Sequence, residues 1–478
     1  LLFWLDYTLF NAESWPLIIV NYILAGLAFL LFYSFAKRDF TTEDTTQNGF
    51  SKNYIIFLSF IALFSKMQAE NFDWEFQSQF FLAFLVPLFS FYLLGKSSLE
   101  KENSAGIFTA TCIFGILSAG TMANGAFTLP VMVFLGFLLR ISCCRIFILT
   151  ALSIATLSLY LTGYVRPGSH GFISHSLAQP VNVLLFMTSY YGLPFKFLLG
   201  KIGCRIFGGL FLYLIARNLW KIFKKEEFNW LNISLFAFTC YVALAGLLSA
   251  LGRVDLFGVN QAYSGRYSTP VIMAWLGFLV IYKNSLAGLL NKSNRNKYIA
   301  LTLPLALVIN QIDRLDNKKD PDAPFEKIVS ILSLEIDAKD IKRVSNRTPG
   351  NYGLLYTRYN SIAGRAKIAS EENISVFGHP LIKDVKEKID KKADGRLCKE
   401  SMGSEIVVEK IAENNEFYRI SGNISSGNNT SESFYLTNGR KITGYVIFNA
   451  NDMAKFRGYN VGGKNIYFYD INNQCRFR

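Results

Sequence analysis

The chain has 478 residues, of which 51% are hydrophobic, 15% aromatic and 18% charged, and its formal net charge is +14. This composition excludes intrinsically disordered and collagen-like chains, because both classes are poor in large apolar and aromatic residues. Its length and hydrophobicity also disfavour a single soluble domain.

The charged residues are distributed unevenly, with a change near residue 311. Residues 1–310 contain 22 Lys and Arg and 13 Asp and Glu, which is 35 of 310 residues, whereas residues 311–478 contain the remaining 27 and 22, which is 49 of 168. Only a membrane region accommodates so few charges, and the stretch 103–139 has none. The pattern predicts an α-helical polytopic membrane domain over 1–311. We attribute the net positive charge to loops beside the membrane and not to nucleic-acid binding.

About ten membrane crossings are expected, several of them shorter than the ~20 residues that a bilayer requires. The stretch 181–195 is predicted to be an interfacial or re-entrant helix instead. The chain starts on Leu1 within apolar sequence, so we expect its natural N-terminus to be missing. The crossings are placed near 16–36, 53–66, 77–95, 104–120, 128–140, 146–165, 202–222, 230–250, 268–283 and 298–311.

Basic residues concentrate in alternate loops and thereby predict the orientation. One set of loops contains 14 Lys and Arg, and the short loops of the other set contain seven. The positive-inside rule places the richer set, including the loops near 37–52 and 284–297, in the cytoplasm. With ten crossings, residues 312–478 then lie outside the cytoplasm.

The soluble region is predicted to contain two segments. Residues 312–395 mix helical patterns, at 325–336 and 362–370, with Pro and Gly turns, and residues 396–478 alternate like the strands of a small β-sandwich. Asn438-Gly439 predicts a two-residue hairpin. Cys398 and Cys475 bracket the strands, and we expect them to form a disulfide in an oxidising compartment. The expected strands are 405–411, 416–421, 433–437, 441–448 and 465–470.

The outward loops contain clusters of polar residues. In the first, Glu70, Asp73 and Glu75 precede a span, where carboxylates suit a divalent cation or acid–base chemistry. The alternative is an interfacial loop anchored by Trp74. In the second, Asn124 lies at a helix break, where it either lines a cavity or caps the next helix.

A third cluster contains two arginines that flank one outward loop, Arg253 and Arg266, together with Gln261 and Tyr267. The arginine fork donates two parallel hydrogen bonds to phosphate oxygens, and aromatic rings suit a sugar face or an isoprenoid chain. The alternative is that both arginines extend toward lipid headgroups. On these grounds the candidate substrate-binding residues are Asn124, Arg253, Gln261, Arg266 and Tyr267. We expect Asn124, Arg253 and Arg266 to line one outward-facing cavity, with 70–79 at its rim.

Other features point to no soluble chemistry. His170 and His175 in another outward loop are interpreted as polar loop residues, and His379 as a turn residue. The remaining five cysteines lie in or beside predicted spans, and no Cys/His spacing suggests a zinc site. The sequence has no P-loop, nucleophile elbow or dinucleotide fingerprint, so ATP or NAD chemistry has no support.

The outward motifs resemble those of a large, poorly characterised group of bacterial inner-membrane proteins that are similar to GT-C-type glycosyltransferases and often accompany surface-polysaccharide genes. The stretches that carry the resemblance are 71–81, 122–130, 190–194 and 251–269, with 374–380 and the Cys-to-Cys β-module in the tail.

The resemblance implies transfer of a sugar from a polyprenyl-phosphate donor to a cell-surface glycan or lipid on the periplasmic face. The usual base in such enzymes lies in the first outward loop, which we expect to precede Leu1. Asp6 and Glu13 lie near that end but do not match the motif, which leaves Glu70, Asp73 and Glu75 as candidates. A divalent cation is the one cofactor left open. The alternatives are a non-enzymatic transport or assembly protein and a structural role in which the β-module binds glycan. We see no internal repeat, and the polar residues gather on one face, which favours the enzyme over a transporter.

Overall fold

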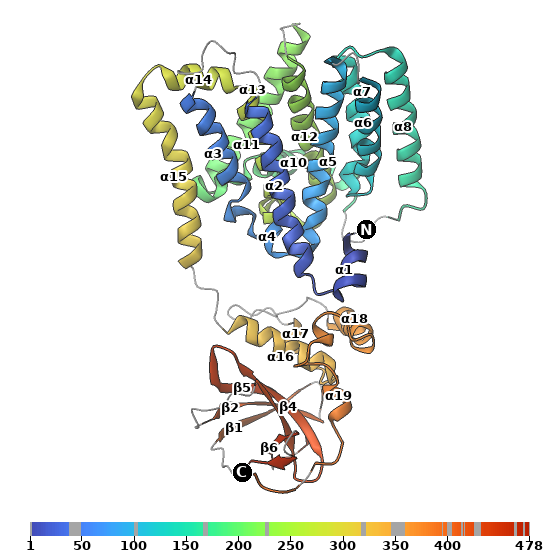
Figure 1. The fold of residues 1–478 in the computed structure, drawn as a ribbon, viewed down its shortest axis with the longest axis vertical. Coiled ribbons are helices and arrows are strands. Elements are labelled where there is room, and N and C mark those ends of the chain that lie inside the picture. The colour runs from blue at the N-terminus through green and yellow to red at the C-terminus, as the bar shows by residue number, and fades with distance from the viewer. Residues whose placement is uncertain are drawn as a thin grey trace. The chain divides into compact units, whose positions relative to one another are not determined.

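The computed structural model divides into two compact units, one made of Leu1–Ser14 with Asn317–Arg478 and the other of Trp15–Asp316 (Figure 1). The first 14 residues thus group with the C-terminal region, and the boundary after the membrane domain lies at 316 instead of 311. The structure describes residues 2–37, 49–99, 104–165, 171–224, 229–316, 322–345, 359–393, 395–398, 404–412, 414, 416–424, 432–462, 466–471 and 474–477.

The unit Trp15–Asp316 consists, in its described residues, of helices and their connecting loops. Each of the ten predicted crossings falls on a helix. The α-helices are α2 (Trp15–Lys37), α3 (Gly49–Leu63), α4 (Ala69–Asp73), α5 (Ser78–Leu99), α6 (Ser104–Ala119), α7 (Thr128–Leu138), α8 (Cys143–Leu161), α9 (Ile173–Leu177), α10 (Pro180–Tyr191), α11 (Leu193–Phe223), α12 (Trp230–Phe257), α13 (Ser268–Ile281), α14 (Lys283–Asn291) and α15 (Asn294–Asp316). The 3₁₀ turns are η2 (Lys66–Gln68), η3 (Glu75–Gln77), η4 (Ala123–Phe127), η5 (Val259–Tyr263) and η6 (Gly265–Tyr267).

Six of the described helical segments are long and apolar enough to cross a membrane, and a bent pair, Gly265–Ile281 with Lys283–Asn291, makes a seventh. Two shorter apolar helices, Ser104–Ala119 and Ala123–Leu138, accompany them. A helical membrane domain is therefore supported by the structure. The number ten stays a prediction. The six segments are Trp15–Lys37, Phe50–Asp73, Glu75–Leu99, Cys143–Leu161, Leu193–Phe223 and Trp230–Phe257.

Close helix packing in this unit depends on glycines at particular positions. A Cβ on Gly208 of α11 would overlap the carbonyl oxygen of Thr188 in α10, and a Cβ on Gly192 would overlap the carbonyl oxygen of Cys204. Small residues permit such backbone approach between membrane helices, where dispersion and not water exclusion drives packing. Beside this contact, the buried Tyr191 donates its hydroxyl to the carbonyl oxygen of Ala243 in α12. The three helices α10, α11 and α12 are thereby held together behind the site described below.

The second unit combines short helices with one antiparallel sheet. Its strands pair in the order β1-β2-β5-β4-β3-β6-β7. The helices are α1 (Leu2–Phe10), α16 (Ala323–Glu335), α17 (Ile341–Ser345), α18 (Tyr359–Glu371) and α19 (Val385–Lys388), with the 3₁₀ turn η7 (Ser375–Gly378). The strands are β1 (Ser404–Lys410), β2 (Phe417–Ile424), β3 (Ser433–Thr437), β4 (Ile442–Asn449), β5 (Asp452–Val461), β6 (Tyr467–Asp470) and β7 (Cys475–Arg476).

The sheet curls around an aromatic core instead of forming the predicted β-sandwich. The rings of Phe456 in β5 and Phe468 in β6 lie 5.1 Å apart, although two strands separate β5 from β6 in the sheet. Neighbouring strands are about 4.8 Å apart, so only strong curvature brings these rings together. A single curved sheet can therefore enclose the core, whereas the predicted sandwich would have required two sheets.

The predicted disulfide is present, with Cys398 and Cys475 joined and their Cα atoms 5.2 Å apart. The predicted hairpin also exists, but its loop covers 438–441, because Thr437 pairs with Ile442. Gly439 takes φ 87°, a conformation that glycine adopts without strain. The loop is thus two residues longer than predicted.

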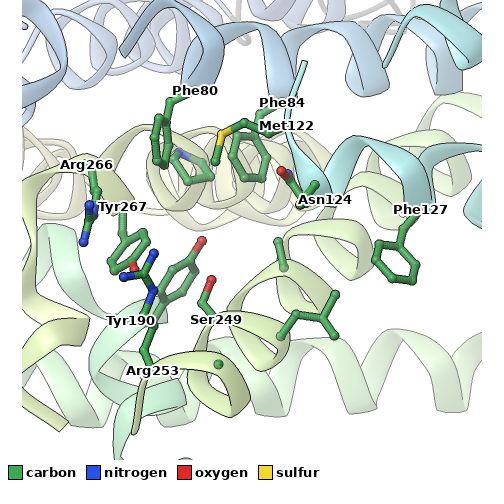
Figure 2. A pocket seen from close by; sticks show the side chains of 15 residues that line it. Phe80, Phe84, Met122, Asn124, Phe127, Tyr190, Ser249, Arg253, Arg266 and Tyr267 are labelled. Carbon is green, nitrogen blue, oxygen red and sulfur yellow. The ribbon is translucent and has the colours of Figure 1, made fainter. Parts of the chain in front are cut away.

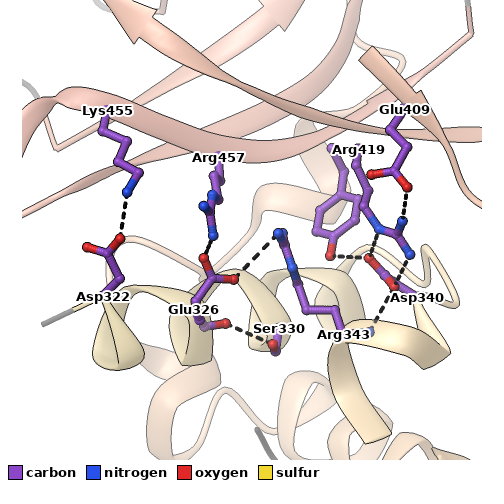
Figure 3. A network of polar contacts seen from close by, with 10 residues as sticks. Asp322, Glu326, Ser330, Asp340, Arg343, Glu409, Arg419, Lys455 and Arg457 are labelled. Carbon is purple, nitrogen blue, oxygen red and sulfur yellow. Dashed lines mark hydrogen bonds and ion pairs between the residues drawn. The ribbon is translucent and has the colours of Figure 1, made fainter. Parts of the chain in front are cut away.

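Strand β5 was missed in the sequence because its polar residues obscure the alternation. Lys455 and Arg457 lie on the face toward α16, where they pair with Asp322 and Glu326 (Figure 3). The opposite face presents Phe456 to the aromatic core. A strand that carries cations toward a helix resembles a loop by composition alone.

An ionic network attaches α16 and α17 to the sheet (Figure 3). Arg419 donates from Nε and Nη2 to the two oxygens of Asp340, at 2.6 and 2.7 Å, and from Nη1 to Glu409 at 2.9 Å. The Tyr459 hydroxyl also donates to Asp340, at 2.9 Å. Burial raises the pKa of Asp340, but the hydrogen bonds and charge of Arg419 outweigh it and hold that pKa below its usual value. Asp340 is therefore ionised and fully paired.

The N-terminal helix α1 packs within this same unit. The backbone N–H of Ser375 donates to the carbonyl oxygen of Asn11 at 2.7 Å, and the Asn11 amide donates to the carbonyl oxygen of Asn373 at 3.0 Å. The Tyr7 hydroxyl donates to Glu372 at 2.9 Å. These bonds join segments more than 360 residues apart in the sequence, which no local pattern predicts.

Candidate functional site

The candidate site is a cavity of about 200 Å³ within the helical unit (Figure 2). Its wall comes from five segments that are distant in the sequence: α5, η4, α10, α12 and the stretch from η6 into α13. Helix α12 contributes one face, at positions 245, 248, 249, 252 and 253, a spacing that places them on the same side of a helix. The lining residues are Phe80, Phe84, Met122, Ala123, Asn124, Phe127, Tyr190, Ala245, Leu248, Ser249, Gly252, Arg253, Arg266, Tyr267 and Pro270.

Asn124 is positioned by a break between α6 and α7. Met122 is extended, with φ −157° and ψ 168°, and the turn η4 then leads into α7. Gly125 sits so close to the Ser118 carbonyl that a Cβ would overlap it. The Asn124 amide donates to the Tyr241 hydroxyl at 3.0 Å, and that hydroxyl donates to the carbonyl oxygen of Ala83 at 2.9 Å. The break thus brings a fixed amide to the cavity wall.

Arg266 is positioned by the loop between α12 and α13, and Glu70 holds that loop. The Glu70 carboxylate accepts the backbone N–H of Arg266 at 3.1 Å and lies 3.4 Å from the Ser264 hydroxyl. A Cβ on Gly265 would approach Glu70 Oε2 to 2.8 Å, so glycine permits this contact. A carboxylate at the start of η6 and α13 also complements the positive end of the helix.

A second layer of amides supports the same loop from behind. Asn71 donates to the carbonyl oxygen of Arg266 at 3.2 Å and to the Thr269 hydroxyl at 2.6 Å. Thr269 in turn donates to Gln68 at 2.5 Å, and Asn21 of α2 donates to the carbonyl oxygen of Asn71 at 3.0 Å. The side chains of Asn21, Gln68, Asn71 and Thr269 are fully buried. Buried and largely satisfied networks of this kind fix one geometry.

The two arginines of the cavity have no ionic partner among the residues that the structure describes. Neither Arg253 nor Arg266 forms an ion pair there, and the Arg266 Nε is buried without a hydrogen-bond acceptor. Each guanidinium lies over a ring instead, Arg266 at 5.3 Å from the Tyr267 centroid and Arg253 at 5.6 Å from that of Phe257. Figure 2 shows Arg253 and Arg266 on the Tyr190 and Tyr267 side of the cavity and Asn124 across from them. The cavity wall therefore combines two cations, an amide and aromatic rings.

The remaining candidates lie outside this wall. Glu70 acts on the loop as described, while Asp73, Glu75 and Gln261 are absent from the lining residues. His175 pairs with Asp255 at 3.4 Å, and His170 lies outside the described residues. No group of three or more His, Cys, Asp or Glu side chains converges for a metal ion within the described ranges.

Sequence reasoning missed the apolar and aromatic part of the wall. Phe80 and Phe84 lie in the first and second turns of α5, directly after the 70–79 loop, and Ser249 precedes Arg253 by four residues on the same face of α12. The helical period would have identified these positions once the loop residues were chosen. Tyr190 lay in a stretch already singled out, but as an interfacial helix.

No family model, curated protein or solved structure matches this chain. The function is therefore inferred from the site itself.

Proposed function

We propose that this protein is a membrane glycosyltransferase of GT-C type that uses a polyprenyl-phosphate-linked sugar. The acceptor is a hydroxyl of a cell-surface glycan or lipid. That oxygen forms a bond to the anomeric carbon and loses its proton to water, while the bond from this carbon to the phosphate oxygen breaks and polyprenyl phosphate is released. The observation that carries the proposal is the pair Arg253 and Arg266 on one cavity wall, with no carboxylate partner in the part of the chain that the structure describes.

The physical argument concerns the cost of cations inside a membrane unit. A guanidinium among apolar helices is expensive unless it is hydrated or meets an anion. Two such groups beside one cavity are best satisfied by a dianionic or diffuse anionic group, and the arginine fork matches phosphate oxygens. The leaving group gains negative charge as its bond to the sugar breaks, so fixed cations there would stabilise the transition state.

The neutral residues of the wall suit a sugar. Asn124 offers an amide whose position is fixed by Tyr241, and the rings of Tyr190 and Tyr267 lie 5.0 Å apart between centroids, tilted by 46°. Aromatic faces bind the apolar face of a sugar ring, while an amide donates to or accepts from its hydroxyls. Among the described residues no carboxylate lines the cavity, so the proposal assigns substrate binding here and assigns no general base.

The proposal places the site on the extracytoplasmic side of a bacterial inner membrane, together with residues 312–478. The supporting observations are the uneven distribution of Lys and Arg between alternate loops and the disulfide Cys398–Cys475, which persists in oxidising compartments. Labelling an exposed β1 position, as in Glu405→Cys, with an impermeant thiol reagent tests this placement. Labelling in intact spheroplasts is expected, and labelling only after lysis would contradict the placement.

The activity is tested with the full chain in lipid nanodiscs and a panel of radiolabelled polyprenyl-phosphate sugars. Release of polyprenyl phosphate that depends on an added glycan acceptor is expected for one donor. Arg266→Lys keeps the charge but loses the bidentate fork, so turnover should fall about 10-fold or more. The matched control is Arg217→Lys, since Arg217 also lies over a ring, 5.5 Å from the centroid of Tyr282, but does not line the cavity.

Tight donor binding without release of polyprenyl phosphate for any donor and acceptor pair would contradict the enzymatic proposal. It would favour the alternative, a non-enzymatic carrier or assembly protein. Unchanged turnover in Arg266→Ala would contradict the assigned role of the cavity.

A further inference from the structure

A second cavity, of about 500 Å³, lies within the other unit and is lined by acidic residues. It is bordered by the end of α16, by α18 and by the segment around α19. Five carboxylates and two ammonium groups line it, which leaves an excess of three negative charges. The charged residues are Glu335, Asp337, Lys367, Glu371, Asp384, Lys386 and Glu387.

Glu335 is the most buried of the carboxylates that line this acidic cleft. Its side chain belongs to a residue that is only 6% exposed, and its Oε2 has no hydrogen-bond partner. Burial raises the pKa of Glu335, and the charges of Asp384 and Glu387 add to this, although a hydrogen bond from Ser370 and the charge of Lys386 act in the opposite direction. An oxygen so placed is costly to leave unsatisfied.

The fold does not account for this carboxylate. Asp340, a fully buried acid of the same unit, receives hydrogen bonds from Arg419 and Tyr459 that attach helix to sheet. Glu335 has no ion-pair partner among the described residues, and it lines the cleft while its Oε2 is buried without a hydrogen-bond partner. Apart from the hydrogen bond from Ser370 and the charge of Lys386, no contact of the described chain compensates this carboxylate, so its charge calls for a ligand.

The ligand expected from this chemistry is a cation larger than a metal ion. No three carboxylate, His or Cys groups of the described chain converge as metal ligands, and the volume far exceeds that of a bare ion. The wall also includes Leu334, Ala363 and Tyr359. Burial, with the charges of Asp337 and Asp340, raises the pKa of Tyr359 to about 12, so its phenol stays protonated and neutral. A carbon skeleton with an ammonium group fits such a wall.

We propose that this cleft binds a protonated primary amine, with the ammonium group at Glu335 and with Asp384 and Glu387 at the rim. An ammonium donates three hydrogen bonds and carries a compact charge, which matches one buried oxygen and neighbouring carboxylates. Two sources share this chemistry, an amino-sugar residue of a glycan and a polyamine. The site is independent of the membrane cavity and of the activity proposed for it.

The test uses the full chain in nanodiscs at low salt near pH 7, with binding followed by isothermal titration calorimetry. The probes are glucosamine and spermidine. N-acetylglucosamine is the uncharged control for glucosamine, and calcium chloride tests whether the cleft binds a metal ion instead. Binding of at least one amine, with no binding of N-acetylglucosamine, is expected. Preference for glucosamine identifies an amino sugar, and preference for spermidine identifies a polyamine.

Glu335→Gln preserves the shape and removes the charge, so amine affinity should fall about 10-fold or more. Glu405→Gln is the matched control, because Glu405 is exposed on β1 and does not line the cleft, and its affinity should not change. If Glu335→Gln does not fold, the rim variant Asp384→Asn/Glu387→Gln gives the same readout. Absence of binding by both amines, binding unaffected by these variants, or calcium binding that depends on Glu335 in place of amine binding would each overturn the proposal.

Discussion

The arginines of the two units are used in opposite ways. In the C-terminal unit, Arg419 and Arg457 are held by the carboxylates of Asp340, Glu409 and Glu326. In the membrane unit, Arg253 and Arg266 line a cavity without such a partner in the described chain. Since a partly buried cation is costly in either place, the first pair is explained by the fold and the second calls for a ligand. Stability and binding should therefore respond to different arginines.

The largest loss of stability is expected from removing the disulfide, because it closes a long loop. The loss should be confined to the C-terminal unit, where both cysteines lie. Opening the bond between Cys398 and Cys475 by the double substitution to Ser releases a loop with a sequence separation of 77. In the chain-entropy model this costs about 3–5 kcal/mol. Hydrogen exchange of peptides from β4 and β5 in the full chain should show the loss, while ligand binding at the membrane cavity stays unchanged. If β4 and β5 of the disulfide-free variant are protected from hydrogen exchange as in the wild type, the stability of the sheet does not depend on the disulfide.

Arg419→Ala should destabilise the same unit by about 3–5 kcal/mol, because it leaves the Asp340 side chain, which has 0% relative exposure, as an unpaired charge. Exchange protection of β2 and α17 reports the effect. The double variant Arg419→Ala/Asp340→Asn should recover part of the loss, since no unpaired charge remains. Equal loss in the single and double variants would mean that packing, and not the charge pair, carries the stability.

The membrane unit should instead be sensitive to helix approach. Gly208→Ala places a methyl group against the Thr188 carbonyl and should cost about 1–3 kcal/mol by overpacking α10 against α11. Gly209→Ala is the neighbouring control, because a Cβ there meets nothing within 4 Å. Thermal unfolding of both variants in the same detergent measures the difference. Equal melting temperatures would contradict the close packing described here.

The smallest effect is expected in the pH dependence of stability, and it should be confined to the C-terminal unit, which contains Asp340. The folded-state pKa of Asp340 is depressed, so its contribution to stability is present above the unfolded-state value of about 3.9 and is lost as pH falls through the folded-state pKa. Exchange-derived stability of α17 and β2 should decrease over this acidic window, and Asp340→Asn should remove that part of the slope. A slope unaltered by Asp340→Asn would assign the acid sensitivity to other carboxylates.

Much of the architecture could be predicted from local pattern. The apolar runs gave helices at the expected places, and strand 433–437 was predicted with the bounds that the structure has. The features that the sequence did not predict depend on contacts between segments far apart in the chain. Strand β5 carries Lys455 and Arg457 toward α16, the sheet curls on itself, and residues 1–14 pair with a segment near residue 375. Each depends on partners that sequence order does not reveal.

The site shows the same division. Asn124, Arg253, Arg266 and Tyr267 were chosen because they lay in loops assigned to one side, and they meet at one cavity. Gln261 was chosen on the same ground, but it lies in the turn η5 and is absent from the lining residues of the cavity. Glu70 was considered as a base, and the structure shows its carboxylate accepting the backbone N–H of Arg266, a contact that the sequence did not indicate. The assignment of loops to one side of the membrane thus predicts which segments lie close together. It does not predict which of their side chains line the cavity, because that depends on the conformation of the turns.

Binding of a polyprenyl phosphate to the full chain in nanodiscs tests the central claim most directly, with the corresponding polyprenol as the uncharged reference. We predict that the phosphate binds more tightly than the alcohol, and that Arg253→Ala and Arg266→Ala each reduce this preference about 10-fold or more without lowering thermal stability. Arg217→Ala, away from the cavity, should leave the preference unchanged. Equal binding of phosphate and alcohol, or a preference that survives loss of both cavity arginines, would contradict the claim that these cations serve a phosphate ligand.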